Sequence, residues 1–168
     1  MAEGHERSYA PAWARDAGAL ALAAWFGGAL FFSTTVAPTL FAVLPSRELA
    51  GAVVGRVLPV LNWSGLAVAL ALLASAKWTG TRRTQTAALA LLAAANLCGL
   101  LIGARIQAIR RAMSGPIDAL AATDPLRQAF GSWHMLSVAT LGIGLIAAAI
   151  AFFAARRAPT AHNRDRFF

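Results

Sequence analysis

The chain has 168 residues, of which 58% are hydrophobic and only 13% are charged. Ordinary soluble domains are roughly 45–50% apolar and about 25% charged, and a chain this short has too little interior to hide the excess from water. The composition therefore argues against a water-soluble fold. The net charge of +8 would suggest a nucleic-acid partner in a soluble protein, but these cations flank long apolar stretches, as they do in membrane proteins. We therefore expect the lipid bilayer, and no nucleic acid, as a partner.

The chain divides into a polar N-terminal segment (residues 1–16), a membrane domain (residues 17–155) and a basic tail (residues 156–168). Four apolar stretches each approach the length of about 20 residues that crosses a hydrocarbon core of about 30 Å as a helix. They cover residues 17–37, 57–76, 87–104 and 133–155. In lipid the backbone must bond within its own segment, and no stretch alternates like a barrel strand. The sequence predicts an all-α, integral membrane four-helix bundle.

The connections between the spans also carry helix signals. Ser46 is a plausible N-cap, and apolar residues recur behind it at helical spacing. This pattern predicts a short amphipathic interfacial helix between spans 1 and 2, lying on the membrane surface and bent near Pro59. Asp124 followed by Pro125 predicts the start of the fourth helix outside the lipid, and the third helix is expected to project toward Met113.

Four spans place both termini on one side of the membrane. Nine Lys and Arg residues then fall on the terminal side and six on the other. Because positive charge favours the cytoplasmic side, we expect cytoplasmic termini and a multi-pass protein of the inner (plasma) membrane.

The polar residues of the spans gather in the leaflet opposite the termini. Because ionisable and amide side chains within a membrane mark functional paths by default, we predict a polar pocket there that binds or passes a small solute or ion. An alternative is structural, since Ser and Thr often bond to their own helix and Asn can tie helices together. The candidate ligand-binding residues are Thr35, Asn62, Asn96, Arg105, His134 and Ser137.

Metal and catalytic chemistry have few residues to draw on. Within the spans there is one histidine (His134), one thiol (Cys98) and one thioether (Met135), whereas a zinc or copper site needs several such ligands. No carboxylate lies within a span to orient a base for a nucleophile. We expect no metal site, no cofactor and no enzymatic activity, with a single haem ligand from His134 as the redox alternative.

Two segments resemble a known family. The residues from Val36 to Phe41 with Gly55 to Pro59, and the segment from Asp124 to Ser137, look like the motifs of small four-helix membrane proteins similar to transmembrane protein 205, whose bacterial members are catalogued as a domain of unknown function. The resemblance implies four spans with structured connections and hints at a metal or solute role. It makes His134, Ser137, Arg105 and Arg127 candidate functional positions.

A second hypothesis needs no binding site. The protein could be a structural or accessory subunit that packs against a larger membrane complex or another copy of itself. Gly99 and Gly103 stand four residues apart in an apolar helix, and such pairs let helix backbones approach closely. We assign this pair to packing within the bundle in preference to self-association.

Overall fold

The structure is a computed structural model that describes residues 11–79 and 81–156. In chain order these residues form α1 (Ala12–Phe31), a π-helical turn η1 (Phe32–Val36), α2 (Ala37–Val43), α3 (Arg47–Thr79), α4 (Arg83–Ala112), a 3-10 turn η2 (Ile117–Ala119) and α5 (Pro125–Arg156). The predicted N-terminal segment 1–16 and the tail 156–168 lie mostly outside this described part.

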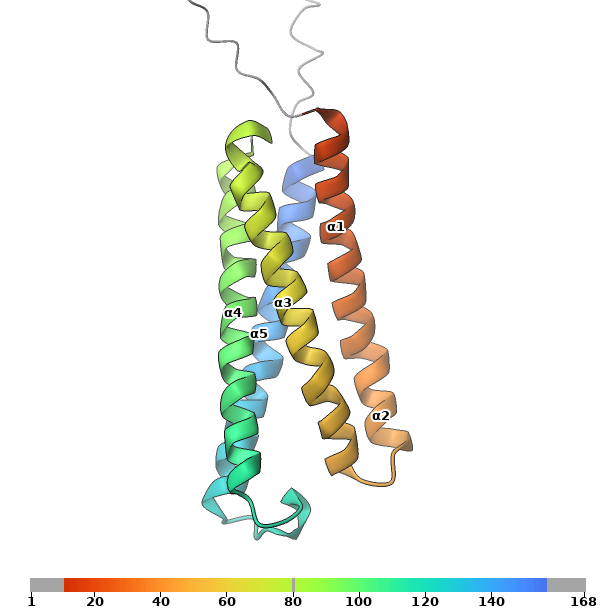
Figure 1. The fold of residues 1–168 in the computed structure, drawn as a ribbon, viewed down its shortest axis with the longest axis vertical. Helices are drawn as coiled ribbons and strands as arrows, with labels where there is room; N and C mark the ends of the chain where they lie inside the picture. Colours follow the sequence, from red (N-terminus) through yellow and green to blue (C-terminus); the bar gives the residue numbers. More distant parts are fainter. Residues whose placement is uncertain (1–10, 80, 157–168) are drawn as a thin grey trace, which may run out of the picture.

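The path from Ala12 to Val43 is helical throughout, so the described residues contain four helices long and apolar enough to cross a membrane. The predicted all-α four-helix membrane bundle is confirmed (Figure 1). The predicted N-caps of α3 and α5 are also as expected. The Ser46 hydroxyl accepts a hydrogen bond from the Leu49 amide (3.2 Å), and the Asp124 carboxylate accepts one from the Leu126 amide (2.8 Å).

The continuous helical stretch formed by α1, η1 and α2 contains a proline, Pro38. Inside an α-helix, a proline ring collides with the carbonyl four residues back. For Pro38 that carbonyl belongs to Thr34, which lies in η1, where the Ala37 amide bonds to the Phe32 carbonyl five residues back. The wider turn makes room for the ring. The helix therefore extends to Val43, past the predicted end of the first span.

The segment predicted as a short helix on the membrane surface is the first part of α3 and packs along α4, which corrects its placement on the surface. Helix α3 has no boundary at Pro59, which lies inside it. Two glycines before the proline bring α3 close to α4: a Cβ at Gly55 would lie 2.6 Å from the Gln107 amide nitrogen, and one at Gly51 would collide with the Arg110 guanidinium. These contacts hold the first half of α3 along the bundle.

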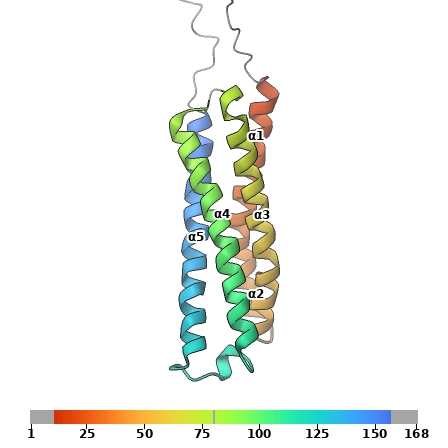
Figure 2. The same cartoon turned by 60° about the vertical axis from the view of Figure 1, so that its left-hand side comes forward.

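The four helical paths close into a ring. Helix α4 packs against α3 and α5, and α1 packs against the same two helices (Figures 1 and 2). The α2–α3 and α4–α5 connections lie at one end of the bundle, which we call the loop end. The start of α1 and the end of α5 lie together at the other, the terminal end.

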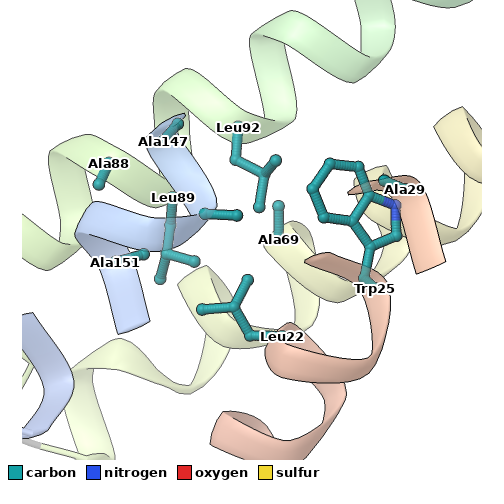
Figure 3. Close-up of a cluster of buried hydrophobic side chains, with 10 residues drawn as sticks. Leu22, Trp25, Ala29, Ala69, Ala88, Leu89, Leu92, Ala147 and Ala151 are labelled. Atoms are coloured by element: carbon teal, nitrogen blue, oxygen red, sulfur yellow. The ribbon is translucent and has the colours of Figure 1, made fainter. Parts of the chain in front are cut away.

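The apolar core joins all four paths. Leu22 and Trp25 of α1, Ala69 of α3 and Leu89 of α4 pack in it with the buried alanines of α5, of which Ala147 is one (Figure 3). Small side chains let helix backbones approach closely where lipid gives no hydrophobic drive for association. Outside the core, large apolar side chains such as Leu20, Val60, Leu101 and Ile146 are exposed, as contact with the lipid bilayer requires.

Candidate functional site

A polar crossing joins α1, α3 and α4 beside the apolar core. Helices α3 and α4 are antiparallel neighbours, and each carries an asparagine three residues before a glycine. The Asn62 side chain lies against Gly99, where a Cβ would be 2.8 Å from either polar atom of the amide. The Asn96 amide lies against Gly65, where a Cβ would be 2.6 Å from its oxygen. Each of the two helices therefore places an asparagine side chain against a glycine of the other.

Within this crossing Asn96 has a structural role. Its side chain is 2% exposed, and its Nδ2 donates a hydrogen bond to the Leu92 carbonyl one turn earlier in α4 (2.9 Å). The indole of Trp25 covers the same glycine, Gly65, and its Nε1 donates to the Leu61 carbonyl (2.8 Å). Asn96 therefore bonds to its own helix and packs against α3, which is a structural role.

Asn62 differs because it also lines a pocket. The pocket lies between α3, α4 and α5 in the loop half of the bundle, with a volume of about 550 Å³, within the range of about 300–1,000 Å³ that is usual for small-molecule sites. Phe41 of α2 and Asp118 of η2 complete its wall. Three of the six predicted site residues line it: Asn62, His134 and Ser137.

The polar side chains of this pocket have unused hydrogen-bonding capacity. Most hydroxyls in the spans bond to their own helix: Ser33 donates to the Ala29 carbonyl (2.7 Å) and Thr140 to the Leu136 carbonyl (2.7 Å). Within the described part of the chain, no such bond is made by the side chains of the three pocket residues named above. Asn62 is only 9% exposed, yet no buried side-chain nitrogen or oxygen in the described chain lacks a partner, so the amide atoms of Asn62 keep access to the pocket. The pocket therefore offers polar groups with free hydrogen-bonding capacity to a ligand or to water.

Cations gather where the pocket approaches the loop end. Arg47 of α3, Arg110 of α4 and Arg127 of α5 line this part, with Asp118 as the acidic residue beside them. The Arg127 Nη1 donates to the Leu120 carbonyl (2.6 Å), which fixes one guanidinium against the α4–α5 connection.

An aromatic pair on α5 extends from these cations along the pocket. The Arg110 guanidinium lies 5.4 Å from the centre of the Phe130 ring, within cation–π range. The Phe130 ring in turn stacks on His134, with centroids 6.0 Å apart and planes 3° apart. This series orders one wall of the pocket.

Two predicted site residues lie elsewhere. Arg105 is exposed on α4 and does not line the pocket, because it stands two residues from both Gly103 and Gln107, which do, and residues two apart on a helix do not share a face. Thr35 is exposed on η1, away from the pocket lining.

The candidate residues drawn from the sequence left out Arg47, Arg110 and Gln107, which all line the pocket. A signal was present, because Gly51 and Gly55 on α3 leave space for the long side chains of Arg110 and Gln107 on α4. Cys98 is exposed on α4, and among the residues described here no three His, Cys, Asp or Glu side chains are grouped to hold a metal ion.

A family model described as a domain of unknown function, DUF4149, matches residues 20–114, more than half of the chain. The chain belongs to the DUF4149 family. No curated protein and no solved structure matches it. The matched range holds α2, α3 and α4 of this DUF4149 protein, and therefore the walls that carry Asn62 and Arg110, whereas α5 with His134 lies beyond it.

Proposed function

We propose that this DUF4149 protein is a non-enzymatic membrane protein that binds a small solute or ion in the pocket between α3, α4 and α5, and releases or passes it on. The observation that carries the proposal is Asn62, a residue only 9% exposed, whose amide makes no hydrogen bond in the described chain and lies on the wall of a pocket that also presents His134 and Ser137. Amide, imidazole and hydroxyl groups between apolar walls are the contacts of a binding site.

Filling the pocket tests this proposal. A Cβ at Gly103, which lines the pocket, would meet no atom within 4 Å, and the same holds at Gly142 on α5, outside the pocket lining. Gly103→Leu should therefore occupy the pocket without disturbing the helices, and Gly142→Leu is the matched control. After gentle solubilisation from native membranes, native mass spectrometry should find a small species on the wild type and on Gly142→Leu, and lose it on Gly103→Leu.

The same measurement addresses the accessory-subunit hypothesis. A stoichiometric protein partner retained equally by the wild type and both variants, with no small species on any of them, would contradict the pocket proposal and favour the subunit role.

We further propose that the termini are cytoplasmic, so that the pocket faces the extracytoplasmic leaflet of the inner membrane. The support is the excess of Lys and Arg on the terminal side of the spans. A phosphatase that needs disulfides to fold is active only in an oxidising compartment. Fused after Phe168 it should be inactive in bacteria, and fused after Gly115 in the α4–α5 connection it should be active. The reverse pattern of activities would overturn the orientation.

A relation to proteins similar to transmembrane protein 205 remains a proposal based on the motifs described above. The part of those motifs between Asp124 and Ser137 lies beyond the range that the DUF4149 model matches. The metal role at which that resemblance hints is not part of the proposed function.

A further inference from the structure

We propose that the ligand of this pocket is an amphiphilic anion: a phosphate or carboxylate group bound by the arginines at the loop end, joined to an apolar body that extends toward Asn62. This inference rests on the proposed function, because it names the chemical class of the ligand for the same pocket. Its basis is the distribution of charge and apolar surface along the pocket.

The charge is unbalanced at one end. Arg47, Arg110 and Arg127 line the loop end of the pocket with a single carboxylate, that of Asp118, and in the described chain no carboxylate forms an ion pair with any of the three. Guanidinium groups match phosphate and carboxylate oxygens in charge and in the spacing of their N–H donors. An anion is therefore the complement of this end.

The Arg110 guanidinium is held in place before any ligand arrives. It is packed beside Gly51 and over the Phe130 ring, so little side-chain freedom remains to be lost on binding. An ordered cation with no paired carboxylate has the properties of an anion-binding residue.

The middle of the pocket is mostly apolar, with Gln107 as a polar group along it. Val54 and Leu58 of α3, Leu100 and Ile106 of α4 and Phe130 of α5 line it between the arginines and Asn62. From Arg47 to Asn62 the helix rises about 22 Å, at about 1.5 Å per residue. A small inorganic anion would leave this length unfilled, whereas an anion with an apolar chain would use both parts.

The depth of these groups in a membrane agrees with such a ligand. Arg47 and Arg110 lie outside the apolar stretches 57–76 and 87–104, and Asn62 lies inside the first of them. In a bilayer the arginines would stand near the headgroups and the apolar walls among the chains. The ligand could come from the bilayer, as an anionic lipid, or from water, as an amphiphilic phosphate.

Two binding measurements on the purified full chain distinguish these sources. In nanodiscs of phosphatidylcholine containing a minor fraction of phosphatidylglycerol with matched chains, native mass spectrometry reports which lipid stays bound. In a neutral detergent, titration with octyl phosphate, with octyl glucoside as the uncharged probe and inorganic phosphate as the chain-free probe, reports the water-soluble source. We expect at least one anionic amphiphile to bind about tenfold more tightly than its uncharged counterpart, and inorganic phosphate alone not to bind.

Neighbouring arginines provide matched controls. Arg110 lines the pocket, whereas the adjacent Arg111 is exposed and does not; Arg47 lines it, whereas Arg56 on the same helix is exposed and does not. Arg110→Gln and Arg47→Gln should each weaken binding of the anionic probe by about tenfold, the effect of losing one charge-assisted contact. Arg111→Gln and Arg56→Gln should leave it unchanged. Because Arg47 is exposed, its variant keeps the test decisive if Arg110→Gln fails to fold.

The outcomes separate this inference from the function on which it rests. Equal loss of anionic probe from all four arginine variants, or equal binding of charged and uncharged probes, would overturn the anion assignment. If Gly103→Leu still displaced the bound species in that case, the binding function would stand without it. Absence of any bound probe or native species on the wild type would contradict both.

Discussion

Trp25→Ala is expected to lower the free energy of unfolding by about 3–5 kcal/mol, the usual cost of truncating a buried tryptophan. The Trp25 side chain is 6% exposed. It donates a hydrogen bond to the Leu61 carbonyl of α3, and a Cβ added at Gly144 of α5 would lie 3.6 Å from its ring. One side chain of α1 thus contacts two other helices, and its removal leaves a cavity where α1, α3 and α5 meet.

Reversible unfolding in mixed micelles, followed by circular dichroism, measures this loss. Trp63→Ala is the control, because Trp63 is 61% exposed on α3 and exposed substitutions usually change stability by less than about 0.5 kcal/mol. Trp25→Phe keeps most of the ring and should lose about 1 kcal/mol, the contribution of the hydrogen bond to Leu61. Equal stabilities of Trp25→Ala and Trp63→Ala would show that the bundle does not depend on this contact.

Gly65→Ala is expected to lower the free energy of unfolding by about 1–3 kcal/mol, although one methyl group is added and alanine is the better helix former. The new Cβ would lie 2.5 Å from the Trp25 indole nitrogen and 2.6 Å from the Asn96 side-chain oxygen. Neither neighbour can move without cost, because both side chains are hydrogen-bonded within the bundle.

The other helical glycines predict a graded series in the same unfolding assay. Gly142→Ala should raise stability by up to about 1 kcal/mol, because a Cβ there meets no atom within 4 Å and only the helix propensity changes. The stability of Gly99→Ala should lie between those of Gly65→Ala and Gly142→Ala. A Cβ at Gly99 would lie 2.8 Å from the Asn62 amide, a side-chain end that can turn into the pocket. A stabilising effect of Gly65→Ala would contradict the close crossing of α3 and α4.

The helices themselves could be predicted from the sequence, because span length, Ser46 and Asp124 are local signals. The two errors lay beside prolines. Pro38 was placed after the end of a span, and the residues before Pro59 were assigned to a helix on the membrane surface, because a proline disfavours helix by its own chemistry. The structure accommodates Pro38 with a π-turn, and it holds α3 against α4 on both sides of Pro59. Both are effects of tertiary packing, which sequence periodicity does not contain.

Of the candidate site, only its depth in the membrane could be predicted from the sequence. Alternating spans place the polar residues toward one end of the bundle, but depth does not say which way a side chain points. Arg105 and Gln107 differ by two positions on α4, and only Gln107 lines the pocket. Asn62 and Asn96 look alike in sequence, each three residues before a glycine. The hydrogen bond of Asn96 to Leu92 and the pocket beside Asn62 separate a packing residue from a candidate ligand-binding residue.

Asn62 takes part both in the contact between α3 and α4 and in the wall of the pocket. Its amide fills the space above Gly99 where α3 meets α4, and the same amide forms part of the pocket wall. An occupant that bonds to Asn62 would supply its amide with a hydrogen-bond partner and secure the contact between two spans together. Ligand binding and the thermal stability of the bundle are then linked quantities, and a rise in melting temperature becomes a means of searching for the natural ligand among candidate anions.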